Sequence, residues 1–577
     1  MRISQWSNFL SLPVALRLAC AEAASPDQLD SPVYDSALDG DQKVFSSLCP
    51  DYTDYARHKH KPLSQGPLQL PYQRPHPNCR KFSSPAAERV IDDLFPHFKD
   101  PDLAQIFRNA FPNTLDTTVL WHVDGLNSQI PPPRMYTRDR DKWKKDRAYS
   151  FIVTGDINAE WLRDSTNQLT QYQALAKSAP DIKNLLLGAI NVQAEFIIAS
   201  PYCNAFQPPD PSRLPPVHSG MDDTVHPAYE PSVVFECKYE LDSLANFLSL
   251  GNQYHAATGA LDFLTPSWYK ALDQVLRVIE AQSTPTFDRE TGNFETNEYT
   301  FSRSTRTGTE TLNLNGIGNP LAGRTGLIRS AFRPSDDATT FGFLIPSNAM
   351  MSVELGRTAD VLTHAAKSPT TSESDANFLV QVAADLRRRS EVIREGIYNY
   401  AVVKHAEFGD VFAFEVDGYG SNLLMDDANV PSLLSLPLLG FVPADDRIYQ
   451  NTRRMVLTQR GNPYYLSGPK FHGIGGPHIG LKNAWPMSVL VQAMTSDSDE
   501  EILDCLERVK NVSVFGLINE SVDVYRGVGS TGDGMTRSWF AWANSVFART
   551  LLWLAEEKPR LVLSKKGKYV VGSGWEA

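Results

Sequence analysis

The sequence predicts an all-α fold in which a ring of helices, a toroid, carries long loops. From about residue 87 onward, apolar residues recur at helical spacing through nearly the whole chain, as over residues 187–197, where they form one face of a helix. Loops rich in Gly, Pro, Asn and Asp separate these segments. The alternation that is typical of strands occurs only briefly, near residues 149–154 and 409–416. A count of about eleven or twelve helices therefore favours a toroid.

The expected helices follow one another closely along the chain. In the last of them, Phe540, Ala543, Phe547, Leu551 and Leu554 share one apolar stripe. A ring of such helices would gather its loops at one rim. Besides 187–197, the stripes predict helices at residues 87–110, 160–178, 239–255, 272–279, 347–366, 379–397, 446–459, 484–494, 499–510 and 536–556.

The composition divides the chain into four parts. Residues 1–24 are similar to a signal peptide, with a basic residue, an apolar stretch and small residues in order, so we expect a secreted or secretory-pathway protein. A disordered cytosolic leader is the alternative. Residues 25–86 are rich in proline and predict an extended N-terminal arm. Residues 87–560 form the expected helical catalytic domain, and residues 561–577 a C-terminal tail.

The charge balance limits the classes of partner. The chain has 577 residues, with 55 Lys and Arg against 67 Asp and Glu and a net charge of −12. Nucleic-acid binding depends on neutralising phosphates with basic side chains, so no nucleic-acid partner is expected. No apolar run reaches the roughly 18 residues that a membrane-spanning helix needs, so no membrane partner is expected either. A monomer acting on a neutral substrate fits better.

The six cysteines form no C-x-x-C pair and no Cys/His cluster at zinc spacing. We therefore expect no structural metal and no cofactor. A disulfide between Cys49 and Cys79 is the first choice, because both flank an irregular, Pro-rich stretch that a covalent link would stabilise.

The chemistry is expected in the loops, because a rigid scaffold concentrates function there. The sequence contains no G-x-x-x-x-G-K-[ST] phosphate loop, no H-E-x-x-H zinc motif and no G-x-S-x-G nucleophile elbow. Its loops instead collect Trp, Arg, Gly and paired Asp. Hydrolysis by carboxylates is the chemistry that remains, and glycoside hydrolysis needs two carboxyl groups, one protonated and one ionised.

Three loops offer these carboxyl groups. Asp336 and Asp337 are adjacent, and two neighbouring carboxylates raise one pKa because they resist ionising together; a solvated turn or a helix cap is the alternative. Asp426 and Asp427 compete for the same role, although capping or packing explains them equally well. Glu520 follows an apolar run and suits the mouth of a pocket, unless it is an ordinary surface glutamate.

A further motif suits the binding of a sugar ring. The face of Trp161 could pack on a pyranose while Arg163 and Asp164 bind neighbouring hydroxyls. A buried Arg–Asp ion pair at a helix start is the alternative. His478, after Gly-Gly-Pro, is either a hydroxyl ligand or a loop histidine bonded within the protein.

Five long motifs together resemble glycoside hydrolase family 125, in order and approximate spacing from about residue 87 to 556. The resemblance implies an (α/α)6 barrel that acts as an exo-α-1,6-mannosidase, removing terminal mannose with inversion and without a metal. The substrate it implies is a mannose-containing oligosaccharide of the mannan or N-glycan type. The motifs are Thr154–Thr166, Phe332–Ala338, Ile345–Asn348, Met425–Leu434 and Thr536–Ser545.

The same resemblance implies roles for single residues. Asp336 corresponds to the general acid and Glu520 to the general base, while Arg163 and Asp164 fall on residues that hold the terminal mannose. The chain departs from the family in a longer, Gly-rich segment between Glu520 and Thr536. The Pro-rich arm before residue 87 and an insert at residues 205–231 lie outside the family core, and extra sequence of this kind is similar to the fungal branch. The other expected substrate-binding residues are Trp161, Arg333, Asp337, Asn348, Asp427, His478 and Arg537.

Two other functions stay open at this point. A different inverting (α/α)6 exo-glycosidase, of the glucoamylase or trehalase type, could use the same Trp-x-Arg-Asp motif for glucose. A toroid that binds glycans without catalysis is the other, and it would be favoured by the loss of either carboxylate.

Overall fold

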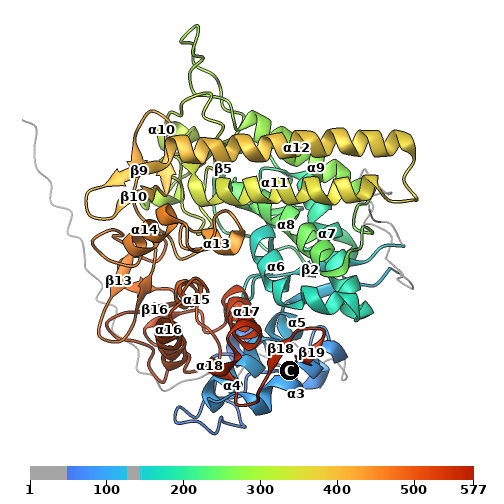
Figure 1. Cartoon of the computed structure of the whole chain (residues 1–577), viewed down its shortest axis with the longest axis vertical. Helices are drawn as coiled ribbons and strands as arrows, with labels where there is room; N and C mark the ends of the chain where they lie inside the picture. Colours follow the sequence, from blue (N-terminus) through green and yellow to red (C-terminus); the bar gives the residue numbers. More distant parts are fainter. Residues whose placement is uncertain (1–48, 126–142, 144–145, 577) are drawn as a thin grey trace, which may run out of the picture. The chain divides into compact units, whose positions relative to one another are not determined.

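The computed structural model describes residues 49–125, 143 and 146–576 (Figure 1). The expected signal peptide, residues 1–24, and the arm up to residue 48 lie outside the described residues. The described part of the arm contains two short turns of helix and lies against the first helices of the domain. There the buried Arg74 Nε lies 2.7 Å from a carboxylate oxygen of Asp116.

Helices make up most of the regular structure. They are α2 (Tyr52–Tyr55), α3 (Pro85–Leu94), α4 (Pro101–Ala110), α5 (Asn113–Thr117), α6 (Leu162–Leu169), α7 (Pro180–Ala199), α8 (Leu241–Thr258), α9 (Pro266–Ala281), α10 (Asn313–Gly316), α11 (Ile345–Ala366), α12 (Glu373–Tyr400), α13 (Leu436–Leu439), α14 (Arg447–Val456), α15 (Pro486–Met494), α16 (Asp499–Val512), α17 (Ala541–Glu557) and α18 (Pro559–Val562).

The predicted helices recur in the structure with three corrections. The segment 160–178 is α-helical only over α6, since Glu160 and Trp161 form a strand and Thr170–Lys177 form a 3-10 helix. The segment 87–110 is two helices, because Pro96 and Pro101 lack the amide hydrogen that a continuous helix needs, and Asp100 caps the second helix by accepting from the amides of Asp102 and Leu103. The segment 536–556 becomes helical only at Ala541, after a short strand and a loop.

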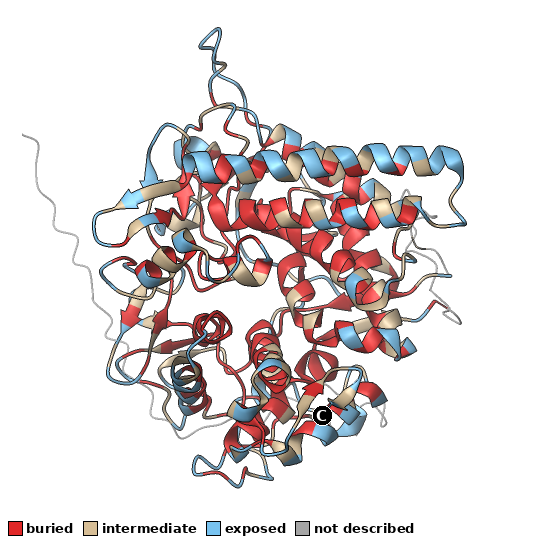
Figure 2. Ribbon diagram, viewed as in Figure 1, coloured by how far each residue is buried: buried red, intermediate tan, exposed pale blue. Residues whose placement is uncertain are grey.

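The helices pack in pairs that differ in burial. Figure 1 shows α11 and α12 lying side by side, and α11 also packs on α8. In the same way α15 contacts α16 and α17, and α17 contacts α6. Figure 2 shows α12 with an exposed outer side, whereas α8 is buried along nearly its whole length. Inner helices such as α11 and α15 are thus covered by outer ones, α12 and α16 respectively.

The structure adds small sheets to the predicted helical fold, and the brief strands expected near residues 149–154 and 409–416 are confirmed. In the described residues every strand pair is antiparallel. Three sheets have three strands, with the central strand given first: β4 (Ala205–Phe206) between β3 (Glu160–Trp161) and β6 (Val234–Glu236), β11 (Glu415–Val416) between β8 (Phe343–Leu344) and β12 (Asn422–Leu423), and β16 (Ser521–Asp523) between β15 (Asn483–Ala484) and β17 (Met535–Thr536). The other sheets have two strands: β1 (Val119–Val123) with β2 (Tyr149–Ile152), β5 (Asp223–His226) with β7 (Thr300–Arg303), β9 (Val402–His405) with β10 (Gly409–Phe412), β13 (Tyr465–Ser467) with β14 (His472–Ile474), and β18 (Lys568–Val570) with β19 (Gly574–Glu576).

Several of these strands lead into inner helices. β3 continues directly into α6 and β8 into α11, while β15 is separated from α15 by one residue. Because each strand is paired, the first turn of the helix that follows is held in place. The first residues of the inner helices therefore meet at fixed positions.

Two disulfides are present. The predicted Cys49–Cys79 bond is confirmed, and a Cys203–Cys237 bond joins the loops before β4 and after β6. Among the described cysteines, Cys505 is unpaired and buried.

One described helix, α7, is long and apolar enough to cross a membrane by length and composition. Within the protein, 72% of its apolar window is buried, and the helix packs against β2 and α9. Such burial is typical of a core helix.

Candidate active site

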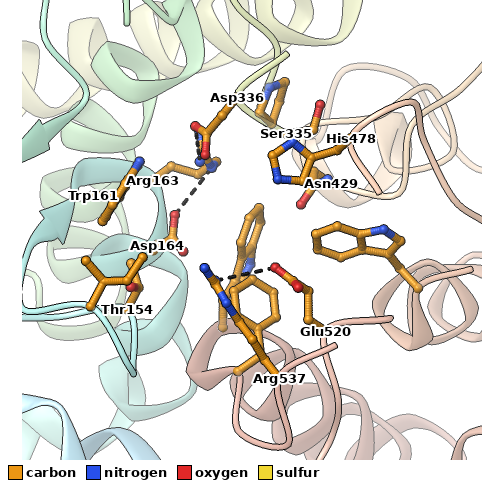
Figure 3. Close-up of a pocket in the computed structure, with 15 residues that line it drawn as sticks. Thr154, Trp161, Arg163, Asp164, Ser335, Asp336, Asn429, His478, Glu520 and Arg537 are labelled. Carbon is orange, nitrogen blue, oxygen red and sulfur yellow. Dashed lines mark ion pairs between the residues drawn. The ribbon is translucent and has the colours of Figure 1, made fainter. Parts of the chain in front are cut away.

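A pocket opens where the N-terminal ends of the inner helices meet. It collects both expected carboxylates and the expected sugar-binding motif, together with an aromatic wall (Figure 3). Its lining residues are Thr154, Ile157, Trp161, Arg163, Asp164, Pro334, Ser335, Asp336, Asn429, His478, Trp485, Glu520, Arg537, Phe540 and Trp542.

Asp336 lies in a tight turn between Phe332 and Ala338, which form an isolated β-bridge. The turn is closed by the amide of Asp336 donating to the carbonyl of Arg333 at 2.9 Å. It places Asp336 at a φ of +67°, a left-handed conformation that L residues adopt at a cost and that recurs at functional sites. The turn thereby directs the Asp336 carboxylate into the pocket.

Arg333 anchors this turn through an ion pair, and its side chain does not line the pocket. Its Nε lies 2.6 Å from a carboxylate oxygen of the buried Glu415. The other oxygen of Glu415 accepts from the amides of Thr340 and Phe341. The expected sugar contact of Arg333 is thus replaced by an ion pair that anchors the loop.

The Asp336 carboxylate meets a buried polar cluster. Arg163 Nη2 lies 3.5 Å from Asp336 Oδ1, and Asn204 Nδ2 donates to the same oxygen at 3.4 Å. Both side chains also hold Glu240, with Arg163 Nη1 at 2.5 Å and Asn204 Nδ2 at 3.1 Å. Glu240 and Asp336 therefore share the same two donors.

Burial and charge in this cluster favour a proton on Glu240. Burial raises the pKa of Glu240 well above its usual value, and the neighbouring Asp336 raises it further, although Arg163 opposes both. Burial alone would also raise the pKa of Asp336, but Lys238, Arg163 and a hydrogen bond with Glu240 hold it below its usual value. The two carboxyl groups thus behave as one coupled pair.

Asp337 does not act on Asp336 in the way the sequence suggested. One of its carboxylate oxygens accepts from Ser335 Oγ at 3.2 Å, and the other lies 3.7 Å from His478 Nδ1. Burial lowers the pKa of His478, but the Asp337 carboxylate raises it, to about 9. Asp337 therefore favours a protonated His478 on the pocket wall.

Glu520 stands across the pocket from Asp336 (Figure 3). The β16–β17 pairing places Ser521 opposite Thr536, so the residue before β16 and the residue after β17 become neighbours. These residues are Glu520 and Arg537, whose Nη1 lies 3.4 Å from Glu520 Oε1. The small sheet thus delivers a carboxylate and a guanidinium together.

The sugar-binding motif is buried at the start of α6. Arg163 Nε lies 3.4 Å from Asp164 Oδ2, so the motif also contains the ion pair that was its alternative. Burial raises the pKa of Asp164 to about 6, against the opposing effect of Arg163.

The aromatic wall offers unused hydrogen-bond donors. Trp161, Trp485 and Trp542 are at most 7% exposed. Among the described residues, none of their indole nitrogens has a hydrogen-bond partner, and neither does the Thr154 hydroxyl. Buried polar atoms are normally bonded, so a ligand rich in hydroxyls suits this pocket.

Three further expected residues lie outside the pocket lining. Asp337 is described above. The Asn348 amide donates to the carbonyls of Ile328 and Leu344 and ties the start of α11 to a neighbouring loop. Asp427 accepts from Ser335 Oγ and from Asn429. These side chains support the pocket wall, and their expected contacts with the substrate stay a prediction.

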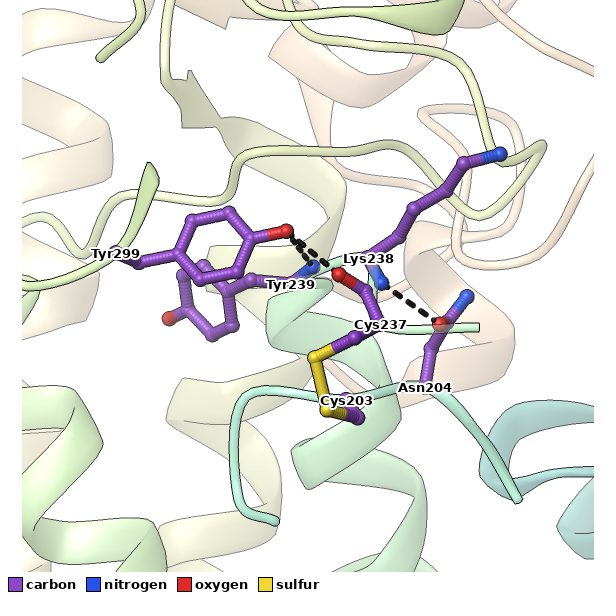
Figure 4. The surroundings of a disulfide bond; sticks show 6 residues. All are labelled: Cys203, Asn204, Cys237, Lys238, Tyr239 and Tyr299. Carbon is purple, nitrogen blue, oxygen red and sulfur yellow. Dashed lines mark hydrogen bonds between the residues drawn. A yellow bond between two sulfur atoms is a disulfide. The ribbon is translucent and has the colours of Figure 1, made fainter. Parts of the chain in front are cut away.

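The sequence reasoning missed Glu240, Asn204 and Lys238. Figure 4 shows how the Cys203–Cys237 disulfide joins the segments that carry two of them, since each cysteine directly precedes one. The amide of Lys238 donates to Asn204 Oδ1 at 3.0 Å. The signal available in the sequence was this pair of cysteine–polar dipeptides.

Two carboxylates facing each other across an aromatic pocket are the arrangement found in glycoside hydrolases. The comparisons with known proteins identify the family. Residues 100–552 match the model of the metal-independent alpha-mannosidase family GH125, and the chain belongs to this family.

Two relatives are similar over most of their length. The meiotically up-regulated gene 157 protein of Schizosaccharomyces pombe is 49% identical over 522 residues, which cover 89% of this chain and 94% of that protein. A solved metal-independent alpha mannosidase of Streptococcus pneumoniae, in a non-productive substrate complex with alpha-1,6-mannobiose, is 30% identical. It covers 81% of this chain, 95% of its own chain is matched, and the TM-score is 0.64.

Proposed function

We propose that this protein is an inverting exo-α-1,6-mannosidase that removes terminal, non-reducing mannose from mannan- or N-glycan-type oligosaccharides. The observation that carries the proposal is the placement of Asp336 and Glu520 on opposite sides of one pocket. The α-1,6-mannobiose bound to the Streptococcus pneumoniae relative supports the linkage. The inner and outer helix layers support closure into an (α/α)6 barrel.

In the proposed mechanism, Asp336 donates a proton to the glycosidic oxygen as the bond to the anomeric carbon breaks. Glu520 takes a proton from a water molecule that attacks the opposite face of that carbon, so β-mannose is released. Arg537, whose Nη1 lies 3.4 Å from Glu520 Oε1, orients the Glu520 carboxylate. Asp336 shares a proton with the neighbouring Glu240. Glu240 thus supplies the proton that Asp336 passes to the glycosidic oxygen.

Arg163 and Asp164 are proposed to bind hydroxyls of the terminal mannose, as the resemblance implies. The indole donors of the aromatic wall add contacts to neighbouring hydroxyls, while the ring faces cover the apolar side of the sugar. Enclosure by this wall favours a single terminal residue, which is consistent with exo-action.

The test is hydrolysis of α-1,6-, α-1,3- and α-1,2-mannobiose followed by proton NMR. We expect cleavage of the 1,6-linked disaccharide with β-mannose appearing first. Asp336→Asn and Glu520→Gln should fold and lose most activity. Early release of α-mannose would contradict inversion, and cleavage of maltose or trehalose instead would favour a glucosidase. Sugar binding without turnover would favour the glycan-binding alternative.

We also propose that the protein is made in the secretory pathway. The two disulfides support this location, because disulfides persist mainly in oxidising compartments. Mass spectrometry of the mature N-terminus from the native source tests it, and an intact Met1 in a cytosolic fraction would contradict it.

A further inference from the structure

A second cavity, of about 380 Å3, lies further along the same inner helices and shares no lining residue with the catalytic pocket. On α17, Trp542 lines the catalytic pocket, whereas Val546 and Arg549 line the second cavity. At 1.5 Å per residue, Arg549 lies about 10 Å further along the axis. On α6, Arg163 lines the catalytic pocket and Asn167 lines the second cavity. The helices thus form two sites, one behind the other.

The second cavity carries more positive than negative charge. Its lining contains Arg357 and Arg549 but one carboxylate, Glu354. Arg357 Nη1 lies 2.7 Å from Glu354 Oε1. The Glu354 carboxylate is therefore already paired with Arg357. Among the described residues, Arg549 has neither an ion pair nor a hydrogen bond from its side chain.

This arrangement is electrostatically costly as it stands. Burial and the like charge of Arg357 both lower the pKa of Arg549. Arg549 is half-buried, so its guanidinium loses part of its hydration and gains no counter-charge from the described residues in return. A bound anion would supply that counter-charge.

Amides and hydroxyls occupy the rest of the lining. Asn167 Nδ2 donates to Asn246 Oδ1 at 3.1 Å, and Gln253 Nε2 donates to Ser249 Oγ at 2.9 Å. This leaves Gln253 Oε1 buried, with no hydrogen-bond partner among the described residues. Amide and hydroxyl side chains of this kind can form hydrogen bonds with the hydroxyl groups of a ligand.

The cavity is accessible from solvent beside Arg357, whose side chain is 45% exposed. Gly440 leaves room there, because a Cβ at that position would come within 2.7 Å of Arg357 Nη2. The guanidinium therefore stands at the mouth of the cavity.

We propose that this second cavity binds a phosphate-type oxyanion between Arg549 and Arg357. The ligand is either inorganic phosphate or the phosphate group of a sugar phosphate whose hydroxyls contact the amides. Guanidinium groups match the geometry of phosphate oxygens. The volume lies within the range of about 300–1,000 Å3 that is typical of small-molecule sites.

Isothermal titration calorimetry of the full-length protein with inorganic phosphate and with mannose 6-phosphate tests the proposal. We expect Arg549→Gln to weaken binding at least about tenfold, the loss of a charge-assisted contact. Tighter binding of mannose 6-phosphate than of phosphate identifies a sugar phosphate as the ligand, and equal affinity identifies phosphate itself.

Arg277→Gln is the matched control, since Arg277 pairs with Asp273 on the exposed face of α9; its Kd should equal that of the wild type. Hydrolysis of an aryl mannoside by Arg549→Gln should be unchanged, which shows a folded protein. If that variant unfolds, Arg549→Lys carries the same test, because a lysine loses the paired contact. No binding of either probe, or an unchanged Kd in these Arg549 variants, overturns the proposal.

Discussion

At the scale of single residues, the proposed mechanism has two carboxyl groups share the catalytic proton. Arg163 and Asn204 contact both Asp336 and Glu240, and burial favours the neutral form of Glu240. Asp336 by itself would stay ionised to lower pH, because Lys238 and Arg163 favour its charged form. Glu240 is thus a positioning residue that extends the pH range over which the acid is loaded.

Replacing Glu240 with Gln should therefore change the pH profile. The amide keeps the size and contacts of a protonated Glu240 but cannot share its proton. We expect the basic limb of the kcat profile to move to lower pH by about one unit or more, with activity retained at acidic pH. Glu354→Gln, which removes a buried carboxylate away from the catalytic pocket, should leave the profile in place. A parallel loss of kcat at every pH would contradict the shared proton.

His478 predicts a pH dependence of stability. Its pKa is raised to about 9, so its contribution is fully present below its ordinary pKa of about 6.5 and is lost as pH rises through about 9. Urea denaturation across this window should show the midpoint falling for the wild type. His478→Gln should remove that part of the slope. An unchanged slope would mean that the Asp337 contact does not stabilise the folded state.

At the scale of elements, the Cys203–Cys237 disulfide and the two-residue strands β3 and β4 hold the part of the pocket that contains Asp336. The Cys203–Cys237 and Cys49–Cys79 bonds close loops of similar length, with separations of 34 and 30 residues. Chain-entropy arguments therefore give them similar contributions to stability. Their neighbours differ, because Asn204 faces Asp336 whereas Cys49 and Cys79 lie in the arm.

The two double Cys→Ser variants should separate stability from catalysis. We expect both to lower Tm by similar amounts, and only loss of Cys203–Cys237 to lower kcat about tenfold or more, since small misplacements at a reacting centre cost large factors in rate. Thermal melts and steady-state kinetics on the same preparations measure this. Equal kcat values would mean that the sheet alone positions Asn204.

The helices could be predicted from the sequence because an apolar stripe is a local pattern, as in α7 and α17. The strands β3 and β16 could not, because two or three residues show no periodicity and their partners lie far along the chain. The same reason explains which site residues could be predicted from the sequence and which could not. Asp336 and Glu520 stand in long motifs, whereas Glu240 becomes visible only when tertiary structure brings it to Asp336.

At the scale of the whole molecule, the proposed chemistry needs no metal. Glu520 activates the attacking water, and the chain belongs to a metal-independent family. EDTA should therefore leave kcat and KM unchanged, as measured on an aryl α-mannoside. A loss that Ca²⁺ restores would place the reaction in a different mechanistic class.

The left-handed backbone at Asp336 has an evolutionary consequence. A glycine adopts a φ of +67° without the steric cost that aspartate bears, a difference of about 1 kcal/mol. Directed evolution that rewards heat resistance alone would meet two opposing effects at Asp336→Gly: relief of the backbone cost, and loss of the carboxylate whose charge Arg163 and Lys238 stabilise. The turn therefore combines a costly backbone conformation with a charge that its neighbours hold.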